Sequence, residues 1–74
     1  MISHDVPALY WDSTFGIAMA LIESYPELNP DNIGLEELFN LIERLPGFAD
    51  NPELANERLL LDVLATWLEE FGNG

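Results

Sequence analysis

Apolar residues recur at helical spacing in three parts of the chain. In the first part they mark one side of a helix, at Ile17, Ala18, Leu21, Ile22 and Tyr25. Spacings of three and four residues are typical of an amphipathic helix. Pro26 disfavours helical backbone at the residue before it, and Asp12 or Ser13 can cap the start with a side-chain oxygen. The pattern therefore predicts a first helix over residues 13–24.

The second apolar stripe begins after a short turn. Asn29 before Pro30 combines a capping residue with a proline at the first helical position, which is enough for one turn. The stripe that follows consists of Leu35, Leu38, Phe39, Ile42 and Leu45. A second helix is predicted from Leu35, and Pro46-Gly47 ends it.

The third stripe is the longest and consists of Leu60, Val63, Leu64, Trp67, Leu68 and Phe71. It is preceded by FADNPELANERLL. In this segment Asn51-Pro52 repeats the helix-start pattern of Asn29-Pro30, and Asn56 is a second residue that could cap a helix start. This segment predicts a short turn that docks onto the long helix or merges with it. Gly72 is expected to end the helix.

Three helices and the absence of alternating strand patterns predict an all-α fold. We expect a flexible N-terminal lead over residues 1–10 and one compact helical domain over residues 11–74. We expect five residues of the third helix to be buried against Leu38, Phe39 and Ile42 of the second helix and Leu21 of the first, namely Leu60, Val63, Leu64, Trp67 and Leu68. Trp11 and Trp67 are expected to anchor the core rather than bind a ligand.

Charge narrows the range of partners. The 74 residues include 14 acids, no Lys and only Arg44 and Arg58, for a formal charge of −12. Such a chain is a poor ligand for nucleic acid and for anionic membranes, whereas a basic protein surface or cations would suit it. The simpler interpretation is that the charge serves solubility alone.

The sequence offers little catalytic chemistry. There is no Cys, and His4, the only His, lies in the lead without partners at a catalytic or metal-binding spacing. We therefore expect that the protein is not an enzyme. Residues 1–10 lack the pattern of a signal peptide, and no apolar run is long enough to span a bilayer. A monomer in the cytoplasm is predicted.

The candidate site residues are carboxylates. They are Glu36, Glu37 and Glu43 of the second helix, Asp50, Glu53 and Glu57 near the start of the third, and Glu69 and Glu70 at its end. Acids in a first turn are stabilised by the helix dipole, so capping alone could explain Asp50, Glu53 and Glu57. Oxygen clusters also bind hard cations, weakly when exposed. The terminal acids oppose the dipole and suggest another role.

Four motifs in order resemble the IscX family of small acidic proteins of bacterial iron–sulfur cluster assembly. The first is Trp11, and the second is YPELNP at residues 25–30. The third is FADNPELANERLL at residues 48–60, and the last is the Trp67-Leu68-Glu69 end. The resemblance covers residues 11–70. In this chain Ala49, Asn51 and Asn29 stand where the family usually carries acids.

The resemblance implies a fold described as a modified winged helix. It also implies an adaptor that docks through complementary charge on the cysteine desulfurase IscS, near the site used by bacterial frataxin. Weak iron(II) binding by surface carboxylates is implied too, here by Asp50, Glu53 and Glu57. The leading hypothesis is an acidic adaptor or regulator of cluster assembly. The alternative is a stand-alone protein that binds or delivers iron(II) or another divalent cation.

Overall fold

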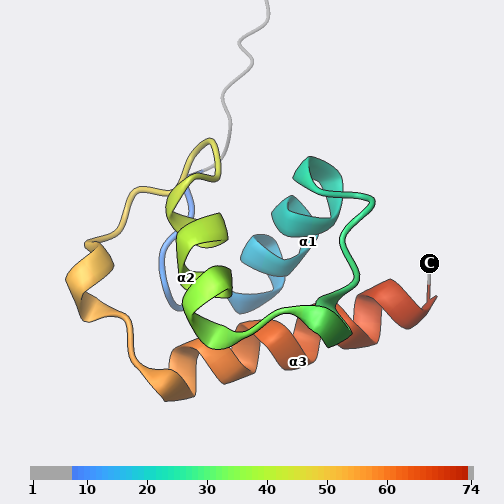
Figure 1. Ribbon diagram of the computed structural model, residues 1–74. Helices are drawn as coiled ribbons and strands as arrows, with labels where there is room; N and C mark the ends of the chain where they lie inside the picture. Colours follow the sequence, from blue (N-terminus) through green and yellow to red (C-terminus); the bar gives the residue numbers. More distant parts are fainter. Residues whose placement is uncertain (1–7, 74) are drawn as a thin grey trace, which may run out of the picture.

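The computed structural model describes residues 8–73, which form three α-helices and two single-turn 3₁₀ helices (Figure 1). In chain order these are α1 (Thr14–Ser24), η1 (Pro30–Asn32), α2 (Leu35–Glu43), η2 (Pro52–Leu54) and α3 (Glu57–Asn73). No strand forms among the described residues, where Leu9 and Phe48 make an isolated parallel bridge. The all-α prediction is confirmed. The winged-helix-like detail stays a prediction.

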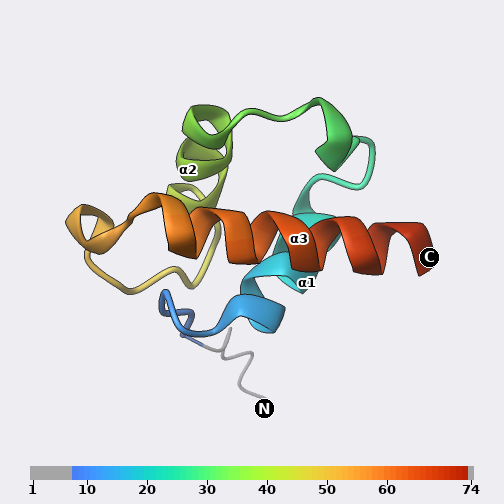
Figure 2. The ribbon, with the colours of Figure 1, turned by 90° about the horizontal axis from the view of Figure 1, so that it is seen from below.

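The helix α3 is the element against which the other helices pack. It contacts α1, α2 and η1, and Figure 2 shows it running across the other helices from one side of the molecule to the other. Its apolar stripe, from Leu60 to Phe71, spans about three turns, so a single helix can cover the inner faces of both shorter helices.

The core lies where the three helices meet. Trp67, Leu21 and Leu38 are fully buried. The predicted contact of the third stripe with the first two helices is therefore confirmed at Leu60, Val63 and Trp67, while Leu64 and Leu68 are partly buried. Burying this apolar surface is the main source of stability for a chain without disulfides.

Phe71 has the helical spacing of the third stripe but does not belong to the buried core. Its side chain is 41% exposed. The last turn of α3 extends beyond α1 and η1 in both views (Figures 1 and 2). Helical periodicity places Phe71 on the inner side, but no other helix of residues 8–73 extends as far as this last turn.

The Asn signals predicted the starts of three elements correctly. The side-chain oxygens of Asn29 and Asn51 each accept a hydrogen bond from the backbone N–H two residues on, at 2.9 Å. Asn56 accepts one from the N–H of Leu59, also at 2.9 Å. Each bond satisfies an N–H that the helix itself leaves free. The backbone is extended at Ala55, so η2 is a separate turn and does not merge with α3.

Two boundary details differ from the prediction. Ser13 precedes α1, but no side-chain hydrogen bond caps this helix. Gly72 does not end α3, which continues to Asn73. A glycine ends a helix by adopting a positive φ, and within the described residues Gly47 is the position that does so, with φ of 90° in the turn after α2.

The chain enters the core earlier than the sequence pattern indicated. Leu9 lies within the segment predicted to be a loose lead, yet it is buried. Its N–H donates to the carbonyl of Gly47, and its carbonyl accepts from the N–H of Ala49. Residues 1–7, including His4, lie outside the described residues.

Candidate interaction surface

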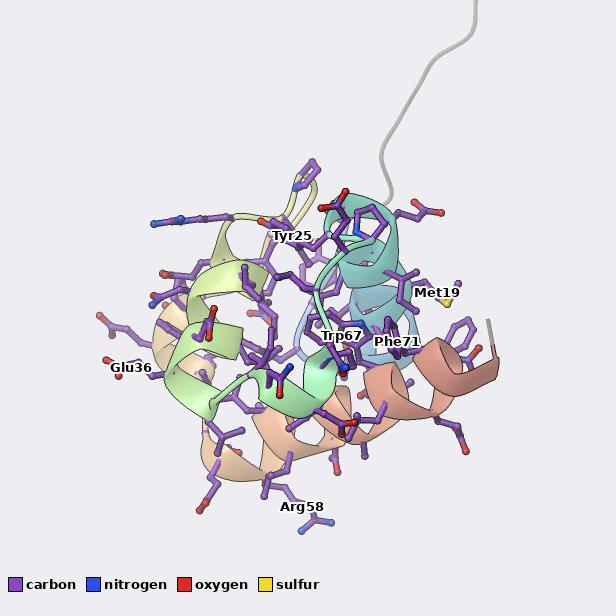
Figure 3. The ribbon with its side chains drawn as sticks, turned by 45° about the vertical axis from the view of Figure 1, so that its right-hand side comes forward. Met19, Tyr25, Glu36, Arg58, Trp67 and Phe71 are labelled. Atoms are coloured by element: carbon purple, nitrogen blue, oxygen red, sulfur yellow. The ribbon has the colours of Figure 1, made fainter. Side chains whose placement is uncertain are left out.

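Five of the predicted site residues lie on elements that share one side of the molecule. They are Glu36, Glu37 and Glu43 on α2, Glu53 on η2 and Glu57 at the start of α3, and all five are exposed. We call this set the acidic edge. The helices α2 and η2 and the start of α3 occupy the same half of the molecule in Figures 1 and 2, and Glu36 points outward in Figure 3. The structure thus brings acids from two separate stretches of the chain to one side.

The cations on this side leave the acidic edge unneutralised. Arg58 pairs with Asp62 one turn along α3, at 3.8 Å, and the two side chains are 85% and 52% exposed. An exposed pair of this kind contributes little stability. Arg44, at the end of α2, makes no ion pair with any carboxylate in the part of the chain that the structure describes. Five exposed carboxylates therefore face solvent without a counter-ion from residues 8–73.

Helix dipoles explain only some of these charges. Glu36, Glu37 and Glu57 lie in first turns, where negative charge is stabilising. Glu43 is the last residue of α2, and Glu69 and Glu70 lie in the last turns of α3, where negative charge is destabilising. No basic residue occupies the last turn of either helix. Helix stability therefore does not account for Glu43, Glu69 and Glu70.

Asp50 has a structural role that the sequence did not reveal. We expected it to contribute to the start of the third helix. Instead its Oδ2 accepts from the backbone N–H of Trp11 at 2.9 Å, and its Oδ1 accepts from the N–H of Asn51 at 2.8 Å. The indole Nε1–H of Trp11 donates to the carbonyl of Asn51 at 2.9 Å. We call these three hydrogen bonds the Trp11 clamp. The two bonds donated by Trp11 hold the 48–52 loop to the entry of α1, the third lies within the loop, and both carboxylate oxygens of Asp50 are occupied.

Glu69 and Glu70 do not belong to the acidic edge. They lie twelve or more residues beyond Glu57 on α3, which is about 18 Å along the helix axis. Glu69 is exposed and Glu70 is half-buried. The predicted acids are thus divided between the acidic edge, a structural loop and a distant helix end.

The predicted metal ligands do not form an assembled site. Within residues 8–73 no three His, Cys, Asp or Glu side chains are close enough together to hold a metal ion. Asp50 is engaged in the Trp11 clamp, and Glu53 and Glu57 lie on different elements. Iron(II) would also find no imidazole or thiolate among them, the softer ligands that favour it over magnesium or calcium. The donor set does not fit a resident iron site.

We therefore expect only weak iron(II) binding that depends on salt. Anaerobic calorimetric titration of the full chain at moderate ionic strength should show no saturable heat in the low-micromolar range. The reason is that scattered, hydrated carboxylates must be brought together at the moment of binding. A stoichiometric isotherm with a submicromolar Kd would contradict this expectation and support the iron-binding alternative.

Fold and surface define a small, strongly acidic three-helix protein with an exposed edge of carboxylates. No helix in residues 8–73 combines the length and apolarity needed to cross a membrane. The sequence profile of the family described as iron-sulphur cluster assembly matches residues 9–72. The chain belongs to this family, the IscX family. It is similar to the Uncharacterized protein PA3808 of Pseudomonas aeruginosa, with 35% identity over 63 residues that cover 85% of this chain and 96% of the relative.

Proposed function

We propose that the protein is a non-catalytic, cytoplasmic adaptor of iron–sulfur cluster assembly that docks on a cysteine desulfurase through its acidic edge. Membership of the family indicates a role in iron–sulfur cluster assembly. The resemblance to IscX suggests the cysteine desulfurase as the partner. The observation that carries the proposal is the exposure of Glu36, Glu37, Glu43, Glu53 and Glu57 on one side of the molecule without internal counter-ions.

The arrangement of these acids suits electrostatic docking. Helix starts stabilise Glu36, Glu37 and Glu57, but like charges held together still repel one another, so helix stability alone does not explain the whole edge. A partner surface rich in Arg and Lys relieves that repulsion and is attracted from a distance of about one Debye length, roughly 8–10 Å at physiological salt. Complementary charge of this kind raises the association rate and selects the partner.

Charge reversal on the edge tests the proposal. We expect the double variant Glu53→Lys, Glu57→Lys to bind a cysteine desulfurase at least about tenfold more weakly than wild type at low ionic strength, because it replaces two attractions with two repulsions. Surface plasmon resonance should show most of the change in the association rate. Both side chains are exposed, so the melting temperature should stay close to that of wild type.

The matched control is Glu69→Lys, Glu70→Lys. It changes the net charge by the same amount at the far end of α3, about 18 Å along the helix axis from Glu57. A purely non-specific attraction would weaken equally in both double variants. If docking occurs through the acidic edge, binding should weaken mainly in the Glu53→Lys, Glu57→Lys variant. Wild-type protein that fails to bind the desulfurase at low salt would overturn the proposal itself.

The iron-binding alternative has less support in the structure. It needs a preorganised cluster of ligands, and the described residues provide none. The calorimetric titration described above distinguishes the two functions, because an adaptor requires no tight metal site.

A further inference from the structure

The helix α1 has an apolar outer surface. From Thr14 to Ile22 it carries no charged residue, in a chain with 14 acids. Ile17, Ala18 and Leu21 are fully buried and account for its inner face. An amphipathic helix usually places polar residues on the opposite face. Here that face presents Phe15, which is 58% exposed, and Met19, one turn further along.

A groove of about 370 Å³ lies along this outer surface. Its lining includes Leu9, Gly16, Met19, Ala20 and Pro46, with the carboxylate of Glu23 one turn beyond Met19. Gly16 lets the chain entry approach the helix closely, since a Cβ at this position would lie 3.2 Å from Cδ2 of Leu9. Figure 3 shows Met19 on the side of the molecule away from Glu36. The groove is therefore separate from the acidic edge.

Charge identifies the occupant that fits this groove. Among the described residues Glu23 is the charged residue that lines the groove, and no cation of residues 8–73 does, although Arg44 is two residues from Pro46 in the chain. A second copy of this chain would bring another formal charge of −12 to the contact, which mutual repulsion disfavours. A cationic partner is instead attracted by the whole molecule and can pair with Glu23.

The shape favours a helix. The groove runs beside α1, which has 11 residues and is therefore about 16 Å long. Two to three turns of a partner helix match this length, and apolar side chains at helical spacing are the usual anchors for such a groove. We infer that the groove on α1 is a second docking surface, and that its occupant is a basic amphipathic helix of a partner protein, with apolar residues against Met19 and Ala20 and a cation at Glu23.

The test uses the full chain labelled with ¹⁵N and a synthetic helical peptide of Leu and Lys arranged amphipathically. At physiological salt we expect saturable chemical-shift changes at the amides of Gly16, Met19, Ala20 and Glu23. A scrambled peptide of the same composition should change the chemical shifts of exposed acidic residues only. Met19→Gln should weaken binding of the amphipathic peptide about tenfold, since it removes an apolar contact and keeps the net charge.

Leu61→Gln is the matched control. Leu61 is 46% exposed on α3 and does not line the groove, so affinity should stay within about twofold of wild type, the size of a surface effect. Met19 is not a buried core residue, and thermal melts should confirm that both variants fold.

Several results would overturn the inference. One is a set of shifts confined to the acidic edge with both peptides. Another is a set of groove shifts that grow with protein concentration without peptide, which would make a second copy the occupant. Nuclear Overhauser contacts between residues 1–7 and Met19 would assign the groove to the chain's own N-terminus. Equal affinity of Met19→Gln and wild type would exclude the groove as the peptide site.

Discussion

Trp67→Ala is expected to lower the melting temperature of the protein by roughly 12–40 °C. The side chain of Trp67 has no exposed surface and lies at the centre of the core, as Figure 3 shows. Truncation of a buried Trp costs about 3–5 kcal/mol, because the contacts are lost and a cavity is left. A domain of 74 residues has a total stability of only about 4–11 kcal/mol. Each kcal/mol lost should lower Tm by roughly 4–8 °C, which circular dichroism melts can measure.

Two variants sharpen this experiment. Phe71→Ala removes an aromatic ring from the same helix at a position that is 41% exposed, and it should cost about 1 kcal/mol or less. Trp67→Phe keeps most of the apolar volume and also removes the indole Nε1–H, which is buried without a hydrogen-bond partner. An unpaired buried donor costs about 1–3 kcal/mol, so relief of that cost offsets part of the lost packing. A Trp67→Ala melt that matched wild type would contradict the core assignment.

Trp11→Ala is expected to be nearly as damaging, by about 3–5 kcal/mol. The indole is only 3% exposed. It stacks on Phe39 with ring centroids 6.3 Å apart, and it meets Phe48 edge to face at 5.0 Å. Its Nε1–H also bonds the carbonyl of Asn51 at 2.9 Å. Truncation would therefore remove core packing and the side-chain hydrogen bond to the 48–52 loop, while the bond from the backbone N–H of residue 11 to Asp50 remains. Urea unfolding monitored by circular dichroism measures the loss.

Graded variants separate packing from hydrogen bonding. Asp50→Ala leaves the ring in place but removes the acceptor of two backbone N–H groups, for an expected cost of about 1–3 kcal/mol. Tyr10→Ala is the control, because this neighbouring aromatic residue is 46% exposed and should change stability by about 0.5 kcal/mol or less. If Tyr10→Ala and Trp11→Ala were equally destabilising, the loss would reflect the chain entry as a whole and not the clamp.

Local signals explain which parts of the fold could be predicted from the sequence. The caps at Asn29, Asn51 and Asn56 act within three residues, and the apolar stripes repeat along one helix, so both are readable from neighbouring residues alone. Contacts between distant segments leave no such local signal. Asp50 was predicted to join a nearby helix start because acids are common there. Its actual partner, Trp11, is 39 residues away.

Part of the candidate site could also be predicted from local sequence patterns, and part depends on contacts between distant segments. That Glu36, Glu37 and Glu43 are exposed followed from their place opposite the apolar stripe of α2. Their shared side with Glu53 and Glu57 depends on how α2 packs on α3, which periodicity does not specify. The groove on α1 was missed for a different reason. Its signal was present in the lack of charge from Thr14 to Ile22, but a pattern of apolar residues does not distinguish a covered face from an open one.

The Trp11 clamp also bears on the order in which the molecule folds. Together with the Leu9–Phe48 bridge it joins segments about forty residues apart and closes a loop that contains both α1 and α2. Helices form within about a microsecond, whereas closing a long loop costs conformational entropy before its contacts form. The chain entry and the 48–52 loop should therefore dock after the helices have formed. In the native state they should open together, as one cooperative unit, while α3 and its core contacts remain intact.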